Sequence, residues 1–341
     1  MEKKSPYFVN WWMDLALIGG ISIVVFSGLA VFDSDVRSPA ILSASAILVW
    51  FINWPHFTAT SFRLFQHRSN WAQYPVTTFF VPVLIMIATF LAYFFPQDFA
   101  PYLVKVFLIW APYHYSAQSL GISLLYARRC EIRFLKWERT CLAGFIFGTF
   151  VVQTIRFETG TGAEFFGITY PGLGIPLWTI TVAKVVMWVC GAGFLLAAVK
   201  RSVQNGRLFP WIILLPPVAQ YFWFMGAVQV ASFYVFVATF HSLQYLLIAW
   251  ALQLKQQIDY EQVEPTRSFA FKQSMVWVTI IFGSGAFLFY ALPRIIHFAF
   301  PEHITLATSI ALIAVAIQMH HFFVDGVIWK LRDARIRNLL Y

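Results

Sequence analysis

Long apolar runs separated by short polar breaks recur from one end of the chain to the other. Each run is close to the roughly 20 residues that an α-helix needs to cross the hydrocarbon core of a bilayer. The runs predict ten membrane-spanning helices, near residues 13–33, 39–62, 75–96, 101–127, 140–156, 174–199, 208–225, 227–253, 273–293 and 304–328. We therefore expect an all-α, polytopic integral membrane protein with one transmembrane domain over residues 1–341.

Two features of this pattern affect the number of predicted spans. The seventh and eighth runs form one apolar stretch that is too long for a single crossing, and the Pro216-Pro217 pair with the polar break at Gly226 and Gln229 predicts a re-entry between two helices. No small-residue cleavage site follows the first run, so we expect a first span there rather than a removed signal peptide. The two longest loops, near residues 157–173 and 255–271, are candidate lids or partner contacts.

Composition supports a membrane location. The chain has 60% hydrophobic and only 11% charged residues, whereas soluble domains carry about 25% charged residues. Its three cysteines, Cys130, Cys141 and Cys190, include no closely spaced pair, which argues against a disulfide framework and against a thiolate metal site.

The distribution of the net charge of +9 indicates how the chain is oriented in the membrane and does not indicate nucleic-acid binding. Lysine and arginine gather in every second loop, near residues 3–4, 63–68, 128–139, 200–207, 255–272 and 330–337. Basic loops stay on the cytoplasmic side, so this alternation predicts an even number of spans with both termini in the cytoplasm. We expect a location in the cytoplasmic (inner) membrane of a bacterium.

Ionisable residues inside the predicted spans are the candidate functional groups. Five of the eight histidines fall there, together with one aspartate: His56, His114, His241, His320, His321 and Asp325. Such groups are costly at membrane depth unless they are paired, hydrated or bound to something. All lie on even-numbered spans, two to four turns from the basic end, so four helices can bring them into one layer in the cytoplasmic half of the membrane.

Polar residues accompany the histidines about one turn further along each helix. They are Thr60, Gln118, Gln244, Tyr245 and Asp325. A metal-bound imidazole usually donates its second N–H to a carboxylate, amide or carbonyl oxygen, so companions of this kind are expected beside metal ligands. Asp325 is either a ligand or such a companion, and Gln118, Gln244 and Tyr245 are the other candidate catalytic residues.

A packed histidine that is hydrogen-bonded to a neighbour is the alternative for each residue taken alone. The grouping on four helices favours a metal site instead. His320 and His321 point about 100° apart on a helix, so both need not reach the same ion. His297 and His303 fall in the last external loop and are expected at the surface.

The donor set indicates which metal to expect. Imidazoles with at most one carboxylate and no thiolate favour iron, copper or zinc over magnesium or calcium. We predict non-haem iron in an oxidoreductase that hydroxylates, desaturates or oxidatively cleaves a lipid or another hydrophobic substrate, with an electron-donor protein as a possible partner.

Three other functions remain open at this point. They are a b-type haem protein with histidine axial ligands, a transporter whose histidines and aspartate lie at the midplane, and a zinc-dependent membrane hydrolase. Membrane fatty-acid desaturases carry closely spaced HxxxH and HxxHH groups, whereas this chain has a single HH pair and isolated histidines, so the sequence assigns no family.

Overall fold

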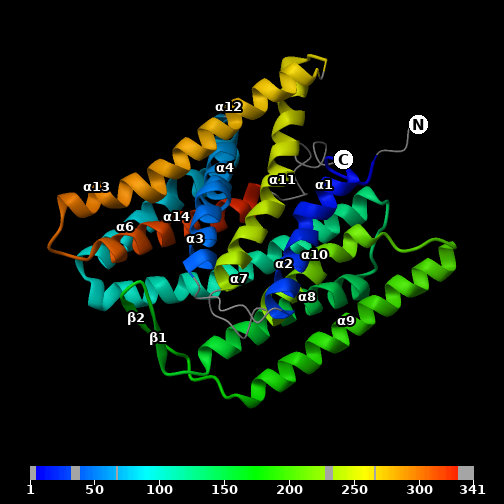
Figure 1. The fold of residues 1–341 in the computed structure, drawn as a ribbon, viewed down its shortest axis with the longest axis horizontal. Coiled ribbons are helices and arrows are strands. Elements are labelled where there is room, and N and C mark those ends of the chain that lie inside the picture. Colours follow the sequence, from blue (N-terminus) through cyan, green and yellow to red (C-terminus); the bar gives the residue numbers. More distant parts are fainter. Residues whose placement is uncertain (1–4, 32–38, 67, 227–232, 265, 329–341) are drawn as a thin grey trace. The chain divides into compact units, whose positions relative to one another are not determined.

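The computed structural model describes residues 5–31, 39–66, 68–226, 233–264 and 266–328, which are almost entirely helical (Figure 1). Within these residues, seven helices are long and apolar enough to cross a membrane. They are Trp11–Gly28, Val76–Phe94, Lys136–Glu158, Trp178–Asn205, Phe236–Asp259, Arg267–Ala299 and Leu306–Ile328. The chain is therefore a helical, membrane-type protein, while the count of ten spans and the side on which the termini lie stay predictions.

Contacts along the chain group the helices in two compact units. Unit 1 comprises Met1–Ser45, Pro112–Thr161 and Leu173–Leu247, and unit 2 comprises Ala46–Ala111, Gly162–Gly172 and Ile248–Tyr341. The predicted single domain is not tested by this division.

Helices joined by short loops make up the described residues of unit 1. Its elements are α1 (Trp11–Leu15), η1 (Ala16–Gly20), α2 (Ile21–Val31), most of α3 (Pro39–Leu48), the second half of α7 (Pro96–Arg129), α8 (Lys136–Glu158), α9 (Trp178–Asn205), α10 (Trp211–Tyr221), η4 (Phe222–Gly226) and the first half of α11 (Phe233–Glu261).

Glycines allow α8 and α9 of unit 1 to pack closely. A Cβ atom added to Gly148 would lie 2.7 Å from the Cβ of Met187, and one added to Gly144 would lie 2.5 Å from the Sγ of Cys190. Neither position therefore accepts a side chain without moving the helices apart, as in other small-residue contacts between membrane helices.

Basic residues of unit 1 gather at one end of its helices. Arg129, at the end of α7, donates hydrogen bonds to the backbone oxygens of Ser5 and Tyr7 at 3.1 and 2.8 Å. Arg201, near the end of α9, forms an ion pair with Glu138 in the first turn of α8 at 2.6 Å. The N-terminal segment and the loop from α7 to α8 therefore lie at the same end, as the charge pattern predicts for these loops. The outermost basic groups, at residues 3–4 and 330–337, lie outside the described residues.

Unit 2 contains the remaining helices and two short strands. Its elements are η2 (Val49–Asn53), α4 (Trp54–Phe65), α5 (Arg68–Gln73), η3 (Val76–Phe80), α6 (Val81–Phe94), the first half of α7, β1 (Gly162–Phe165), β2 (Ile168–Pro171), the second half of α11, α12 (Arg267–Ala286), η6 (Phe287–Ala291), α13 (Leu292–Ala299) and α14 (Leu306–Ile328). Helix α4 packs against α12 and α14, and α14 also packs against α6 and α13. The Thr58 hydroxyl of α4 donates to the backbone oxygen of Ile281 of α12 at 2.6 Å.

Three segments of unit 2 are single π-helical turns, η2, η3 and η6, each followed by a proline at the second position of the next helix: Pro55, Pro82 and Pro293. Proline has no N–H and its ring displaces the carbonyl group four residues earlier, which widens the preceding turn. The first of these prolines is directly followed by His56, so a widened turn precedes one candidate ligand.

The hairpin β1–β2 adds two short strands to a chain that is otherwise helical, nearly as the sequence predicts. The strands pair antiparallel within residues expected to form a loop, with Phe165 opposite Ile168. Phe166 and Gly167 both have positive φ, at 50° and 82°, which is typical of a type I′ turn. The second candidate loop is also shorter than expected, because α11 continues to Glu261.

Candidate metal centre

His114 and His241 form a pair of imidazoles within unit 1. His114 lies on α7 and His241 on α11, and their ring centroids are 5.0 Å apart with the planes at 74°. The Tyr115 ring lies beside His241, with 4.3 Å between centroids. This pair is therefore held between two helices and covered on one side by an aromatic ring.

Two glutamines fix the backbone around this pair. The Gln118 amide donates to the backbone oxygen of His241 at 2.9 Å and lies 3.4 Å from the Gln244 side-chain oxygen. The Gln244 amide in turn donates to the backbone oxygen of Ile18 in η1. The bonds to the backbone oxygens of His241 and Ile18 tie α7, α11 and η1 together. That these glutamines also accept hydrogen bonds from the imidazole N–H groups stays a prediction.

His56 and His321 form a second pair within unit 2. His56 lies on α4 and His321 on α14, and their ring centroids are 4.4 Å apart with the planes at 67°. The Phe57 ring lies 5.0 Å from the His321 ring. Asp325 lies one turn beyond His321, with its Oδ2 atom 3.5 Å from Nε2 of that histidine. The Thr60 hydroxyl donates to Oδ1 of the same carboxylate at 3.2 Å, so Asp325 is positioned to orient the His321 ring.

Burial separates the two adjacent histidines of α14. His56 and His321 are 0% exposed, His241 is 1% and His114 is 7% exposed. We refer to these four buried side chains, two in each unit, as the histidine cluster, and each of them offers a ring nitrogen that could bind a metal ion. His320 is only partly buried and does not belong to the cluster, so of the two predicted alternatives the structure favours His321. Tyr245 is 4% exposed, and its predicted catalytic role stays a prediction.

The spacing within each pair can be compared with metal coordination. A bond of about 2.1 Å between metal and imidazole nitrogen places the centroids of two rings on one ion roughly 4.5 Å apart at 90°, about 5.2 Å apart at the tetrahedral angle and about 6.4 Å apart when opposite. The observed separations of 4.4 and 5.0 Å match adjacent ligands. Because a haem takes its two axial ligands from opposite sides, neither pair can ligate a haem between its rings.

The sequence gives no signal for the aromatic rings that line these pairs. Tyr115 and Phe57 each follow a candidate ligand directly in the sequence, yet neighbouring positions on a helix point about 100° apart and give no signal that the ring will touch another helix's histidine. Only the packing of α7 with α11, and of α4 with α14, makes these contacts.

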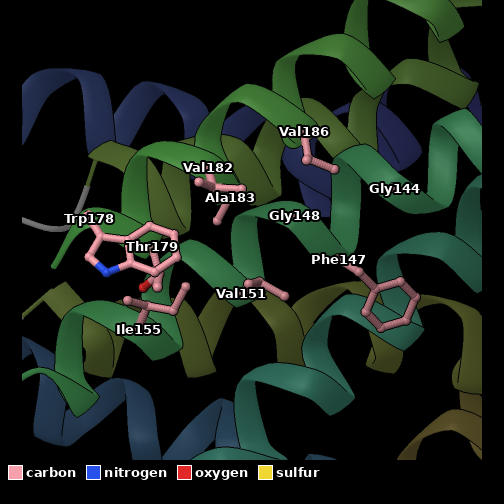
Figure 2. A pocket seen from close by; sticks show the side chains of 10 residues that line it. All are labelled: Gly144, Phe147, Gly148, Val151, Ile155, Trp178, Thr179, Val182, Ala183 and Val186. Atoms are coloured by element: carbon pink, nitrogen blue, oxygen red, sulfur yellow. The ribbon is translucent and has the colours of Figure 1, made fainter. Parts of the chain in front are cut away.

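A groove elsewhere in unit 1 carries no such chemistry. This groove between α8 and α9 has a volume of about 500 Å³. Figure 2 shows Phe147, Val151 and Trp178 among the residues that line it. No histidine or acidic residue contributes to its lining. It is therefore an apolar surface feature and not the candidate metal centre.

Comparisons of the chain with protein-family models, with curated proteins and with solved structures find no match.

Proposed function

We propose that the protein is a membrane-embedded oxidoreductase in which His56, His114, His241 and His321 bind one non-haem iron ion. The observation that carries this proposal is the spacing of the two buried imidazole pairs, at 4.4 and 5.0 Å, which suits adjacent ligands of a metal ion. All four side chains are buried, and neutral imidazole is a good ligand for iron, copper and zinc.

Coordination number favours iron over zinc among these metals. Four imidazoles complete the tetrahedral shell of zinc and leave no position for a reacting water, as in structural zinc sites. Iron commonly takes six ligands, so the same four imidazoles would leave two positions for dioxygen and for substrate. Zinc hydrolysis therefore becomes the weaker alternative.

The reaction class follows from the surroundings of the site. Bound iron would supply the means of activating dioxygen, and a substrate able to enter a helical membrane protein sideways is a lipid or another apolar molecule. Hydroxylation balances as one C–H bond, one dioxygen, two electrons and two protons giving one alcohol and one water. The electrons would come from a one-electron donor protein.

The chain's own residues would bind the ion, orient its ligands and keep water away. Asp325 would accept the N–H of His321 at Nε2 and leave Nδ1 for the metal, which fixes the tautomer of that ring. Tyr115 and Phe57 would cover the imidazoles and exclude bulk water from the bound ion. Gln118 would hold α7 against the backbone of His241.

Replacing His241 by alanine tests the proposal. We expect the variant to lose most of its bound iron while remaining folded, because removal of one of four ligands opens the coordination shell but deletes only one buried side chain. Metal content is measured by elemental analysis of purified protein, with far-ultraviolet circular dichroism as the check on folding. His303→Ala serves as the matched control, because His303 is exposed and lies outside the cluster. Equal iron in the two variants would remove His241 from the proposed site.

A further inference from the structure

Two loops lie side by side at the basic end of unit 1. They are residues 130–135, between α7 and α8, and residues 206–210, between α9 and α10. Phe134 of the first loop stacks on Phe209 of the second, with 6.4 Å between the ring centroids. The backbone N–H of Phe209 also donates to the Ser202 hydroxyl oxygen near the end of α9 at 2.9 Å. The two loops therefore meet at one surface.

The first loop is also tied to the end of α9. Arg201 donates to the backbone oxygen of Arg133 at 3.0 Å and forms the ion pair with Glu138. Glu138 in turn accepts a hydrogen bond from the backbone N–H of Leu135 at 2.7 Å. The side chains that project from this surface therefore start from a backbone whose position is fixed.

Exposed cations outnumber exposed carboxylates on this surface. Residues 130–139 and 200–207 are all described by the structure, and Glu131 is the one exposed acidic residue among them. Glu138 is 3% exposed and already paired with Arg201. We call the exposed cations of these two segments the basic surface of unit 1: Arg133, Lys136, Arg139, Lys200 and Arg207.

A segment of unit 2 shows that orientation in the membrane does not require this excess. Residues 259–272, around the turn from α11 to α12, are predicted on the same side of the membrane as the basic surface. Their exposed charged side chains include two cations and three carboxylates: Arg267, Lys272, Asp259, Glu261 and Glu264. Acidic residues have little influence on orientation, so topology explains the cations of unit 1 but not the scarcity of carboxylates among them. A surface that binds anions explains both.

Exposed apolar side chains indicate which anion this surface meets. Leu135, Trp137 and Leu208 lie among the cations and are 57%, 48% and 93% exposed. Tryptophan is enriched where the hydrocarbon core of a bilayer meets the headgroups, and lysine and arginine near helix ends extend to the same level. An anion that contacts these cations beside exposed apolar side chains is therefore a lipid headgroup rather than an acidic soluble protein.

We propose that the basic surface of unit 1 binds phospholipids whose headgroups carry a net negative charge. The cations bind the phosphate oxygens through charge-assisted hydrogen bonds, and Leu135, Trp137 and Leu208 contact the upper part of the acyl chains. The proposal depends on unit 1 alone and is independent of the metal and of the proposed reaction.

The experiment titrates the full-length protein with lipid. Delipidated protein in an uncharged detergent receives either phosphatidylglycerol, which is anionic, or phosphatidylcholine with the same acyl chains, which has no net charge. Native mass spectrometry counts the lipids bound to each chain and gives the apparent Kd. We expect saturable binding of phosphatidylglycerol and much weaker binding of phosphatidylcholine.

Substitution of the cations tests the location of the site. The triple variant R133Q/K136Q/R139Q removes three exposed charges and leaves the Arg201–Glu138 ion pair in place. We expect its affinity for phosphatidylglycerol to fall by about 10–100-fold, with an unchanged far-ultraviolet circular dichroism spectrum. If this variant does not fold, K200Q/R207Q removes two cations of the same surface and is expected to weaken binding in the same direction.

A matched control removes the same charge from unit 2. The triple variant R68Q/R267Q/K272Q replaces three exposed cations that lie outside the basic surface, and its affinity for phosphatidylglycerol should stay close to that of the wild type. Because binding is measured on purified protein, an effect of either variant on orientation in the cell does not alter the result.

Three results would overturn the proposal. Equal weakening in the two triple variants would show that only the net charge of the chain matters. Equal affinity for the two lipids would exclude recognition of the headgroup. Tighter binding of polyglutamate than of phosphatidylglycerol, at the same concentration of negative charge, would assign the surface to an acidic protein instead.

Discussion

Single residues decide the chemistry proposed for this chain. The sequence predicted the histidines at issue from one principle, the cost of an ionisable group at membrane depth, and four of the five intramembrane histidines belong to the buried cluster. The same reasoning could not separate His320 from His321, because adjacent positions differ only in the direction that the side chain takes from the helix. It also did not anticipate that Gln118 and Gln244 bond to backbone oxygens, since the partner of an amide depends on which carbonyl the packing leaves within reach.

Asp325→Asn tests the role of the carboxylate beside His321. The asparagine keeps the shape of the side chain but removes its charge, so it holds the imidazole tautomer less firmly. We expect metal affinity to fall by about 10–100-fold while the protein stays folded. The measurement is a competition titration against a chelator of known affinity. Unchanged affinity would show that Asp325 does not support a ligand.

Gln118→Ala tests the amide that joins α7 to the backbone of His241. The variant removes the side-chain donor to the backbone oxygen of His241, and the loss of one such hydrogen bond costs about 0.5–1.5 kcal/mol. We expect a lower unfolding temperature together with weaker metal binding, both measured on the same preparation. A loss of stability with full metal affinity would assign Gln118 to the fold alone.

At the scale of elements, hydrophobic periodicity placed the helices well. A helix occupies most of the described part of every predicted span, although residues 174–177, 208–210 and 304–305 precede their helices. A run of apolar residues long enough to cross a bilayer must satisfy its backbone hydrogen bonds internally. The hairpin β1–β2 was missed, although the alternation in GAEFFGITYP with a glycine at the turn is a signal for it. The positions of Pro55, Pro82 and Pro293 also indicate the π turns, because the missing N–H of each proline disrupts the preceding turn.

Gly148→Ala tests the close contact between α8 and α9. The added Cβ would lie within 2.7 Å of the Met187 Cβ atom, so the helices must separate, at a cost of about 1–3 kcal/mol. Thermal unfolding monitored by circular dichroism should show a clear decrease in Tm. Gly121→Ala on α7 is the control, since nothing lies within 4 Å of its added Cβ and alanine favours helix; its Tm should stay the same or rise. Equal behaviour of the two variants would contradict the close packing.

In the molecule as a whole, the composition and the long apolar helices indicate a membrane protein, and the charge pattern predicts its orientation. Seven helices in the described residues meet the length and hydropathy that a span requires. Helix α7 does not meet them, because the histidine, glutamine and serines that give it chemical interest also lower its hydropathy. Helices α11 and α14, which carry His241 and His321, do meet the criterion. The low hydropathy therefore concerns α7 in particular, and the predicted count of ten is not decided by this criterion.

Reporter fusions test the topology. A reporter that is active only in the cytoplasm should be active when fused after Tyr341 and after residue 206, in the basic loop between α9 and α10. The same reporter fused after residue 172, next to the hairpin, should be inactive. Activity at all three positions, or at residue 172 alone, would contradict the predicted orientation.

Elemental analysis of the purified wild-type protein, with an optical spectrum of the same sample, is the decisive test of the proposed iron site. We expect about one iron ion per chain, held by four imidazoles, and no Soret band. A Soret band, stoichiometric zinc in place of iron, or protein that binds no metal when iron is supplied would contradict it.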